Sequence, residues 1–221
     1  ATERVELTSD ARLFTPLDVA TRNGAAWFEI PNRGGKGGVP KGFKDEGFTF
    51  IQIGWEFDVA REAGKLALRV PRARNVDGSA IRGDVSAVFT PDKAQETVDL
   101  TDLRDYPPVD PTGVRRRLVV RERASSSCGV EIARDRWILD GGKVRLDGGF
   151  KAGRTYEVTY ESEAPPVAGL GYAAIRDAVE WFRHDDAAPV RVLQAYAFGS
   201  SQCGRFLRDL VYLGFNTDER G

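Results

Sequence analysis

The segment Gly199–Gly204 (Gly-Ser-Ser-Gln-Cys-Gly) lies between an apolar run and an amphipathic run and contains the best candidate nucleophile of the chain. Many hydrolases carry a nucleophilic serine on a sharp strand-to-helix turn. The residues two before and two after that serine must be small, because the turn strains the serine backbone. Ser201 meets this requirement, with Gly199 before it and Cys203 after it. Ser200 does not, because a phenylalanine stands two positions before it.

Such a turn also supplies part of an oxyanion hole. The backbone N–H of Gln202, at the start of the following helix, would point to where negative charge develops. A second donor usually comes from the loop after an earlier strand. The alternating residues Phe48–Ile53 run into Gly54 and Trp55, so we take Trp55 as the candidate donor. Two plainer interpretations stay open, namely Ser201 as a helix N-cap and Trp55 as an ordinary core residue.

A serine nucleophile needs a histidine base and an acid, and hydrolases with this turn carry them in the order serine, acid, histidine. The chain has one histidine, His184, and it precedes Ser201. It lies in an expected helix-to-strand loop, which normally meets the edge of the sheet opposite the nucleophile. We therefore interpret His184 as a surface residue that its neighbour Asp185 cannot orient as a triad acid. The base and the acid are expected beyond Gly221.

The elements that would hold the serine turn follow the Pro165–Pro166 pair. Residues 171–183 place apolar side chains at helical spacing. Residues 190–198 are nearly all apolar, which suits a strand buried on both faces. Residues 205–213 return to helical spacing before Gly214, a typical helix stop. This order of helix, strand and helix is typical of an α/β core.

The first 161 residues have a different pattern. Short alternating runs predict β-strands at residues 66–70, 85–89, 144–146 and 156–160. Turn sequences lie between such runs, at Asn75–Gly78, Asp140–Gly142 and Asp147–Gly149. The sequence therefore predicts a β-rich region over residues 1–161, with a β insertion at about residues 60–155, and the start of a second region over residues 162–221.

Five segments resemble a family of large bacterial proteins with an α/β-hydrolase domain: Glu29–Gly34, Gly47–Asp58, Gly169–Asp177, Gly199–Arg208 and Gly214–Gly221. Ser200 and Cys203 depart from that family's pattern without disabling the turn. The resemblance implies the fold class α/β, with a partial α/β-hydrolase core and a large β-rich N-terminal part or insertion. Because members of the family are longer, it also implies that these 221 residues end part-way through a catalytic domain.

The predicted function is hydrolysis of a carboxylic ester through an acyl-enzyme on Ser201. We expect a small-molecule ester as substrate and neither a cofactor nor a metal. The alternative is a non-catalytic β-rich binding or structural protein with an incidental Gly-Ser turn. A half-built sheet would expose an apolar edge, so we expect the rest of the chain, or another polypeptide, to cover the surface of residues 190–213.

Composition and charge argue against several other classes of protein. Hydrophobic residues make up 41% and charged residues 29% of the chain, as in soluble globular proteins. The 32 basic and 33 acidic residues nearly cancel, which argues against a nucleic-acid partner. No apolar run reaches the roughly 18 residues that span a bilayer. If a signal peptide preceded Ala1, the protein would be secreted or periplasmic.

Three other features carry weaker predictions. Cys128 and Cys203 are too few for a disulfide scaffold, and Cys203 is either just the small residue of the turn or bonded to Cys128 or another cysteine. The glycine-rich residues 32–38 lack the Lys-Ser/Thr ending of a phosphate-binding loop and indicate a turning loop. The acidic stretch Asp99–Asp110 lacks the glycine of a calcium-binding loop and indicates a solvated loop.

Overall fold

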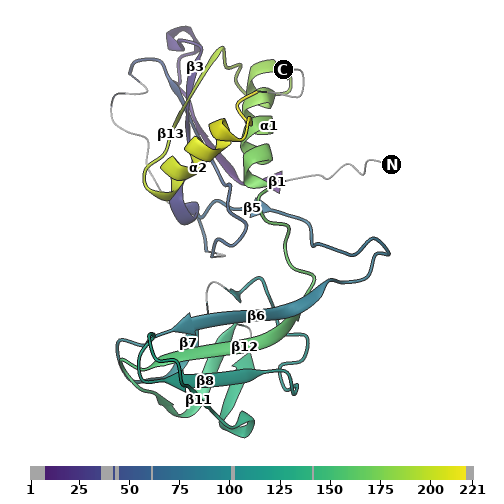
Figure 1. Cartoon of the computed structure of the whole chain (residues 1–221). Coiled ribbons are helices and arrows are strands. Elements are labelled where there is room, and N and C mark those ends of the chain that lie inside the picture. Colours follow the sequence, from purple (N-terminus) through teal and green to yellow (C-terminus); the bar gives the residue numbers. More distant parts are fainter. Residues whose placement is uncertain are drawn as a thin grey trace. The chain divides into compact units, whose positions relative to one another are not determined.

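The computed structural model describes residues 8–35, 42, 45–60, 62–100, 103–140 and 142–217 (Figure 1). The strands are β1 (Thr8–Ser9), β2 (Ala11–Phe14), β3 (Ala25–Glu29), β4 (Thr49–Ile53), β5 (Leu68–Arg69), β6 (Arg82–Phe89), β7 (Gln95–Asp99), β8 (Arg117–Arg121), β9 (Val130–Glu131), β10 (Trp137–Asp140), β11 (Lys143–Phe150), β12 (Thr155–Glu163) and β13 (Gln194–Phe198). The helices are α1 (Gly171–His184) and α2 (Gln202–Tyr212), with single 3₁₀ turns η1 (Val19–Thr21), η2 (Asn32–Gly34) and η4 (Arg134–Arg136). The chain forms two compact units: unit 1 is residues 1–71 with 167–221, and unit 2 is residues 72–166.

The predicted fold class, α/β with a partial α/β-hydrolase core, is wrong. The described residues are mostly β-strands in four sheets, with two helices of 14 and 11 residues, so the chain is β-rich. An α/β core needs a helix between most successive parallel strands. The described residues between β3 and β4 form no α-helix, and most strand pairs are antiparallel. The prediction took the fold class from the strand-turn-helix segment after residue 162 and from the family resemblance, although it expected residues 1–161 to be β-rich.

The largest sheet of unit 1 has the order β13-β3-β4-β2. β3 pairs in parallel with both β13 and β4, while β2 is antiparallel to β4. Because the three parallel strands run the same way, their carboxyl ends meet at one edge of the sheet. The loops that follow β3, β4 and β13 are therefore neighbours, although they are far apart in the sequence.

Both helices pack their apolar stripes against this sheet. Buried residues of α1 and α2, such as Ile175, Phe206 and Leu210, join buried strand residues such as Phe28 and Ile51 in one core. The helical spacing read from residues 171–183 and 205–213 is confirmed, because α1 and α2 cover those residues with only small shifts at their ends. Figure 1 shows α2 (yellow) leading directly out of β13.

β13 is an exposed edge strand, which corrects the prediction that residues 190–198 are buried on both faces. All five of its residues are exposed, and the strand pairs only with β3 among the described residues. Tyr196 stacks on Trp27, and Phe198 remains 55% exposed. An apolar run reports hydrophobicity but not the number of neighbouring strands. Cover of this surface by further polypeptide stays a prediction.

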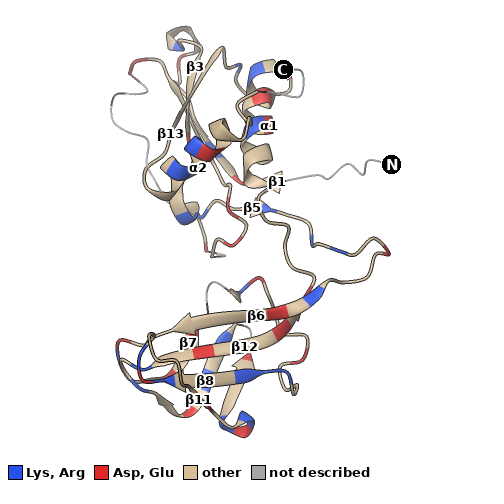
Figure 2. Ribbon diagram, in the orientation of Figure 1, with Lys and Arg blue, Asp and Glu red and all other residues tan. Residues whose placement is uncertain are grey.

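Unit 2 contains two sheets, with the orders β6-β12-β8-β9 and β10-β11-β7. Both contribute to one core, in which Tyr160 and Trp137 are almost fully buried. Gly148 and Gly149 lie inside β11, next to an irregularity in its register with β7, so the predicted turn there is a bulge. Ion pairs link neighbouring strands, namely Arg82–Glu163, Arg117–Glu131 and Arg121–Glu157, and Arg115, just before β8, pairs with Glu161 of β12. Figure 2 shows both signs of charge interspersed in this unit.

Some predictions fall on residues outside the described ranges. Of the glycine-rich residues 32–38, the structure describes 32–35 only, and residues 101–102 of the acidic stretch are not described. Ala1 and Gly221 also lie outside. Neither helix in the described part of the chain is long and apolar enough to cross a membrane.

Candidate active site

Ser201 occupies the turn between β13 and α2, and its backbone is strained. Its φ is 55° and its ψ is −116°, a region that side-chain-bearing residues rarely adopt. This confirms the predicted strained backbone at the turn. Ser201 stands at the N-cap position of α2, but its side chain makes no capping hydrogen bond, and the residue is exposed. The hydroxyl is therefore not used to cap the helix.

Two glycines allow this turn to close. A Cβ atom at Gly199 would lie 2.5 Å from both the carbonyl carbon and the carbonyl oxygen of Cys203. A Cβ atom at Gly204 would lie 2.9 Å from the carbonyl oxygen of Gly199. Real Cβ atoms do not come as close as 2.5 Å to backbone atoms, so the strand and the helix meet here only because Gly199 has no side chain.

Gln202 is the first residue of α2. The first backbone N–H groups of a helix have no acceptor within the helix and carry its partial positive charge. The N–H of Gln202 is therefore suited to bind an anion formed beside Ser201. The amide of the next residue is already used, because Cys203 N–H donates to the Ser200 carbonyl at 3.1 Å. The side chain of Gln202 turns to another strand end and donates to Glu56 at 2.7 Å.

Trp55 follows β4 at the same edge of the sheet as the Ser201 turn. Its indole N–H donates to the Pro31 carbonyl at 3.1 Å, and its ring centroid lies 4.4 Å from that of Phe206 on α2. A Cβ atom on Gly171, the first residue of α1, would lie 2.6 Å from the Trp55 carbonyl oxygen. The side chain of Trp55 thus packs against α2 and its backbone carbonyl lies against the start of α1. A second oxyanion donor could come only from its backbone.

Glu56 is a functional candidate that the sequence analysis did not single out. Its side chain is 9% exposed, and Oε1 accepts the hydrogen bond from Gln202. Burial raises the pKa of the Glu56 carboxyl above its ordinary value of 4.5, and the nearby Asp58 raises it further. A backbone hydrogen bond from Arg33 and the Gln202 contact act in the opposite direction.

Arg33 was also missed. It lies in η2, the turn that follows β3, with φ 50° and ψ 42°, so its backbone is left-handed. Arg33 and Glu56 lie in the segments Glu29–Gly34 and Gly47–Asp58, which resemble the hydrolase family without indicating a role for either residue. Arginine has no preference for the left-handed conformation, so no local signal marks Arg33. A buried glutamate can be found only once the strand order is known.

A cavity of about 220 Å³ opens beside the start of α2. Aromatic and acidic side chains dominate its lining: Trp55, Glu56, Phe57, Asp58, Gly169, Gly171, Tyr172, Gln202 and Phe206. A small molecule bound there would contact the first residue of α2. The pocket therefore lies next to Gln202, the residue that follows Ser201.

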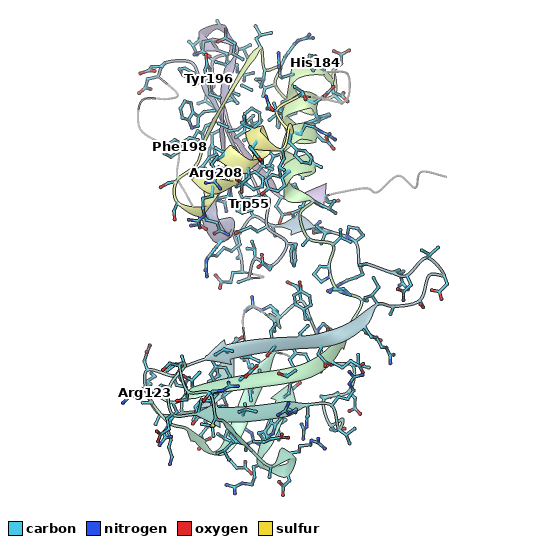
Figure 3. The ribbon with its side chains drawn as sticks, in the orientation of Figure 1. Trp55, Arg123, His184, Tyr196, Phe198 and Arg208 are labelled. Atoms are coloured by element: carbon cyan, nitrogen blue, oxygen red, sulfur yellow. The ribbon has the colours of Figure 1, made fainter. Side chains whose placement is uncertain are left out.

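His184 lies at the other end of the sheet. It is the exposed last residue of α1, and the Val192 N–H, just before β13, donates to the Phe182 carbonyl at 2.9 Å. The end of α1 is thereby tied to the amino end of β13, whereas Ser201 follows its carboxyl end. The five residues of β13 rise about 16 Å. Figure 3 shows His184 and Trp55 at opposite ends of the helices.

Both cysteines are free thiols, so the structure contains no Cys128–Cys203 disulfide. Cys203 is buried, and burial together with the carboxylates of Glu56 and Glu29 raises the pKa of its thiol to about 11. A thiol with that pKa stays protonated at neutral pH and is a poor nucleophile. Cys203 therefore serves as the small residue that lets α2 begin close to β13.

Comparison of the chain with protein families, with curated proteins and with solved structures finds no match in any of the three. Within the described ranges, no three histidine, cysteine or acidic side chains gather closely enough to hold a metal ion.

Proposed function

We propose that this protein is a serine hydrolase that cleaves a carboxylic ester through an acyl-enzyme on Ser201. One observation carries the proposal: an exposed serine in a strained conformation, between a parallel strand and a helix, whose hydroxyl has no capping role. Strain of this kind persists only where the surrounding structure enforces it, and it is concentrated at functional sites.

The proposed chemistry follows from the turn. The Ser201 Oγ attacks the ester carbonyl carbon, its proton passes to a general base, and the carbonyl oxygen becomes an oxyanion facing the Gln202 N–H. The carbon–oxygen bond to the alcohol then breaks, and the base returns the proton to the leaving alcohol. Water hydrolyses the acyl-enzyme in the same way, which releases the acid and restores the hydroxyl.

The general base in this proposal is not His184. The length of β13 separates that histidine from Ser201, and the 221-residue sequence contains no other histidine. The proposal places the base and the acid of the triad outside residues 1–221. Experiments on catalysis must for this reason use the intact protein.

Labelling with a fluorophosphonate probe tests the proposal, because the probe reacts covalently with activated serines. We expect the intact protein to be labelled on Ser201, identified by mass spectrometry of the modified peptide. Ser201→Ala should remove the label, while the matched control Ser200→Ala should keep it. Absence of labelling in a folded protein, or equal labelling of the Ser201→Ala variant, would favour the non-catalytic binding or structural protein instead.

A further inference from the structure

Glu56 is a buried carboxylate at the edge of the sheet where the loops after β3, β4 and β13 meet. Its Oε2 has no hydrogen-bond partner among the described residues, although the atom is buried. Leaving a buried carboxylate oxygen unpaired is costly, so its presence needs a reason other than stability. An apolar side chain at this position would avoid that cost.

The contacts of Glu56 tie three strand ends together. Its backbone belongs to the loop after β4 and is fixed by the Leu68 N–H, which donates to the Glu56 carbonyl at 2.9 Å. Its carboxylate accepts from the Gln202 side chain, which belongs to the residue directly after Ser201. The backbone of Arg33, in the turn after β3, lies close enough to the carboxylate to lower its pKa.

The hydrogen bond between Gln202 and Glu56 restrains the start of α2, directly after the Ser201 turn. The backbone strain at Ser201 would relax if the start of α2 could shift, and Gln202 is the residue that a shift would move first. A hydrogen bond from a neutral amide to a charged carboxylate is about twice as strong as one between neutral groups. Such a bond holds the first residue of α2 while leaving its backbone N–H free for an oxyanion.

We infer that Glu56 is the positioning residue of this site: through its hydrogen bond with Gln202 it fixes the start of α2, and so keeps the Ser201 hydroxyl and the Gln202 N–H in position relative to each other. The inference rests on the proposed function of Ser201. Glu56 contacts neither the substrate carbonyl nor the nucleophile in this role. It acts on the reaction only through Gln202.

The test compares the rate of fluorophosphonate labelling in intact variants. Glu56→Ala removes the acceptor and should slow labelling of Ser201 by at least about tenfold, since a small misplacement of reacting groups costs that much or more. Glu56→Gln keeps an acceptor for Gln202 and should stay within about threefold of wild type, because its side-chain carbonyl can take the same hydrogen bond. The matched control is Glu62→Ala, at an exposed glutamate outside the site, which should label at the wild-type rate.

A double-variant cycle shows whether Glu56 acts through Gln202. Gln202→Ala should slow labelling as much as Glu56→Ala, and the double variant should be no slower than the slower single variant. With an ester substrate, kcat should fall while KM stays nearly constant, because substrate binding is not what Glu56 supports. A merely structural role would instead lower the melting temperature without this non-additive effect on kcat.

The results separate the two proposals. Wild-type protein without labelling at Ser201 refutes the proposed function. Wild-type labelling together with an unchanged rate in folded Glu56→Ala, or an equally large loss in Glu56→Gln, overturns the positioning role alone. If Glu56→Ala does not fold, Gln202→Ala decides, and a wild-type rate in that variant overturns the role.

Discussion

His184 and Ser201 lie beyond opposite ends of the same five-residue strand, β13. A triad base must come within hydrogen-bond distance of its nucleophile, about 3 Å, and the strand alone spans about five times that. His184, the one histidine in the sequence, is therefore excluded as the base of Ser201, because the length of β13 lies between them.

The first prediction follows from this separation. His184→Ala should leave ester hydrolysis by the intact protein within a few-fold of wild type, because His184 is an exposed residue at the wrong edge of the sheet. Loss of a true triad base costs on the order of 10⁴–10⁶ in kcat, so initial-rate measurements separate the two cases easily. A loss of that size in a folded variant would contradict the topology described for unit 1.

The second prediction concerns Ser201 itself. Ser201→Ala should abolish ester hydrolysis and change the free energy of unfolding by no more than about 0.5 kcal/mol, because the exposed hydroxyl makes no capping hydrogen bond. Kinetic assays and urea unfolding of the same preparations check both halves. A variant that is clearly destabilised would indicate that the hydroxyl belongs to the fold rather than to a substrate.

The third prediction concerns the glycine that closes the turn. Gly199→Ala should destabilise the protein by about 1–3 kcal/mol or more, because the added methyl group would meet the backbone of Cys203. Gly83→Ala in β6 is the matched control, since a Cβ atom there meets nothing within 4 Å. The urea midpoint of Gly199→Ala should be lower than that of Gly83→Ala. Equal midpoints would mean that the turn can accommodate a methyl group at residue 199.

The fourth prediction concerns pH and the Glu56 carboxyl. Because its pKa in the folded protein is raised above 4.5, the folded state keeps a proton that the unfolded state has already lost. The contribution of Glu56 to stability is therefore full below pH 4.5 and is lost as the pH rises through the raised value. The advantage of wild type over Glu56→Gln should shrink over that range and then level off. Urea unfolding of both proteins at a series of pH values measures it, and an advantage that grows with pH would reverse the assigned sign.

The fifth prediction uses the two thiols. Iodoacetamide should modify the exposed Cys128 of the folded protein at neutral pH, whereas Cys203 should react only after unfolding. Burial and a pKa of about 11 both protect Cys203. Peptide mass spectrometry before and after denaturation distinguishes the sites. Early modification of Cys203 would show that α2 detaches readily from the sheet.

The local structure around Ser201 could be predicted because it depends on nearby residues. The small residues Gly199 and Cys203 indicate a tight turn, and the helical spacing of apolar residues over 205–213 predicts the helix that follows. The apolar run alone predicted a strand buried on both faces, because a local sequence does not show whether a strand lies on the free side of β13. Only the expectation of a half-built sheet predicted an exposed apolar surface over residues 190–213. The same limit explains the error in fold class, which depends on how distant strands pair.

Glu56 shows the corresponding limit for the site. Nothing around residue 56 distinguishes a buried glutamate from a solvated one, and its partner Gln202 is 146 positions away. The contact exists because β4 and β13 flank β3 in parallel, so the loops after them converge. The sequence contains both residues, but their contact can be predicted only from the order of the strands in the sheet.

The ends of unit 2 lie side by side. Arg72 and Pro166 form an antiparallel bridge, and the Ala73 N–H donates to the Pro165 carbonyl at 2.8 Å. Immediately outside them, the Val167 N–H donates to the Pro71 carbonyl at 3.0 Å. To the rest of the chain, the whole of unit 2 is thus topologically equivalent to one tight hairpin loop. Unit 2 could therefore be lengthened, replaced or removed without any change in the strand order of the sheet that leads to Ser201.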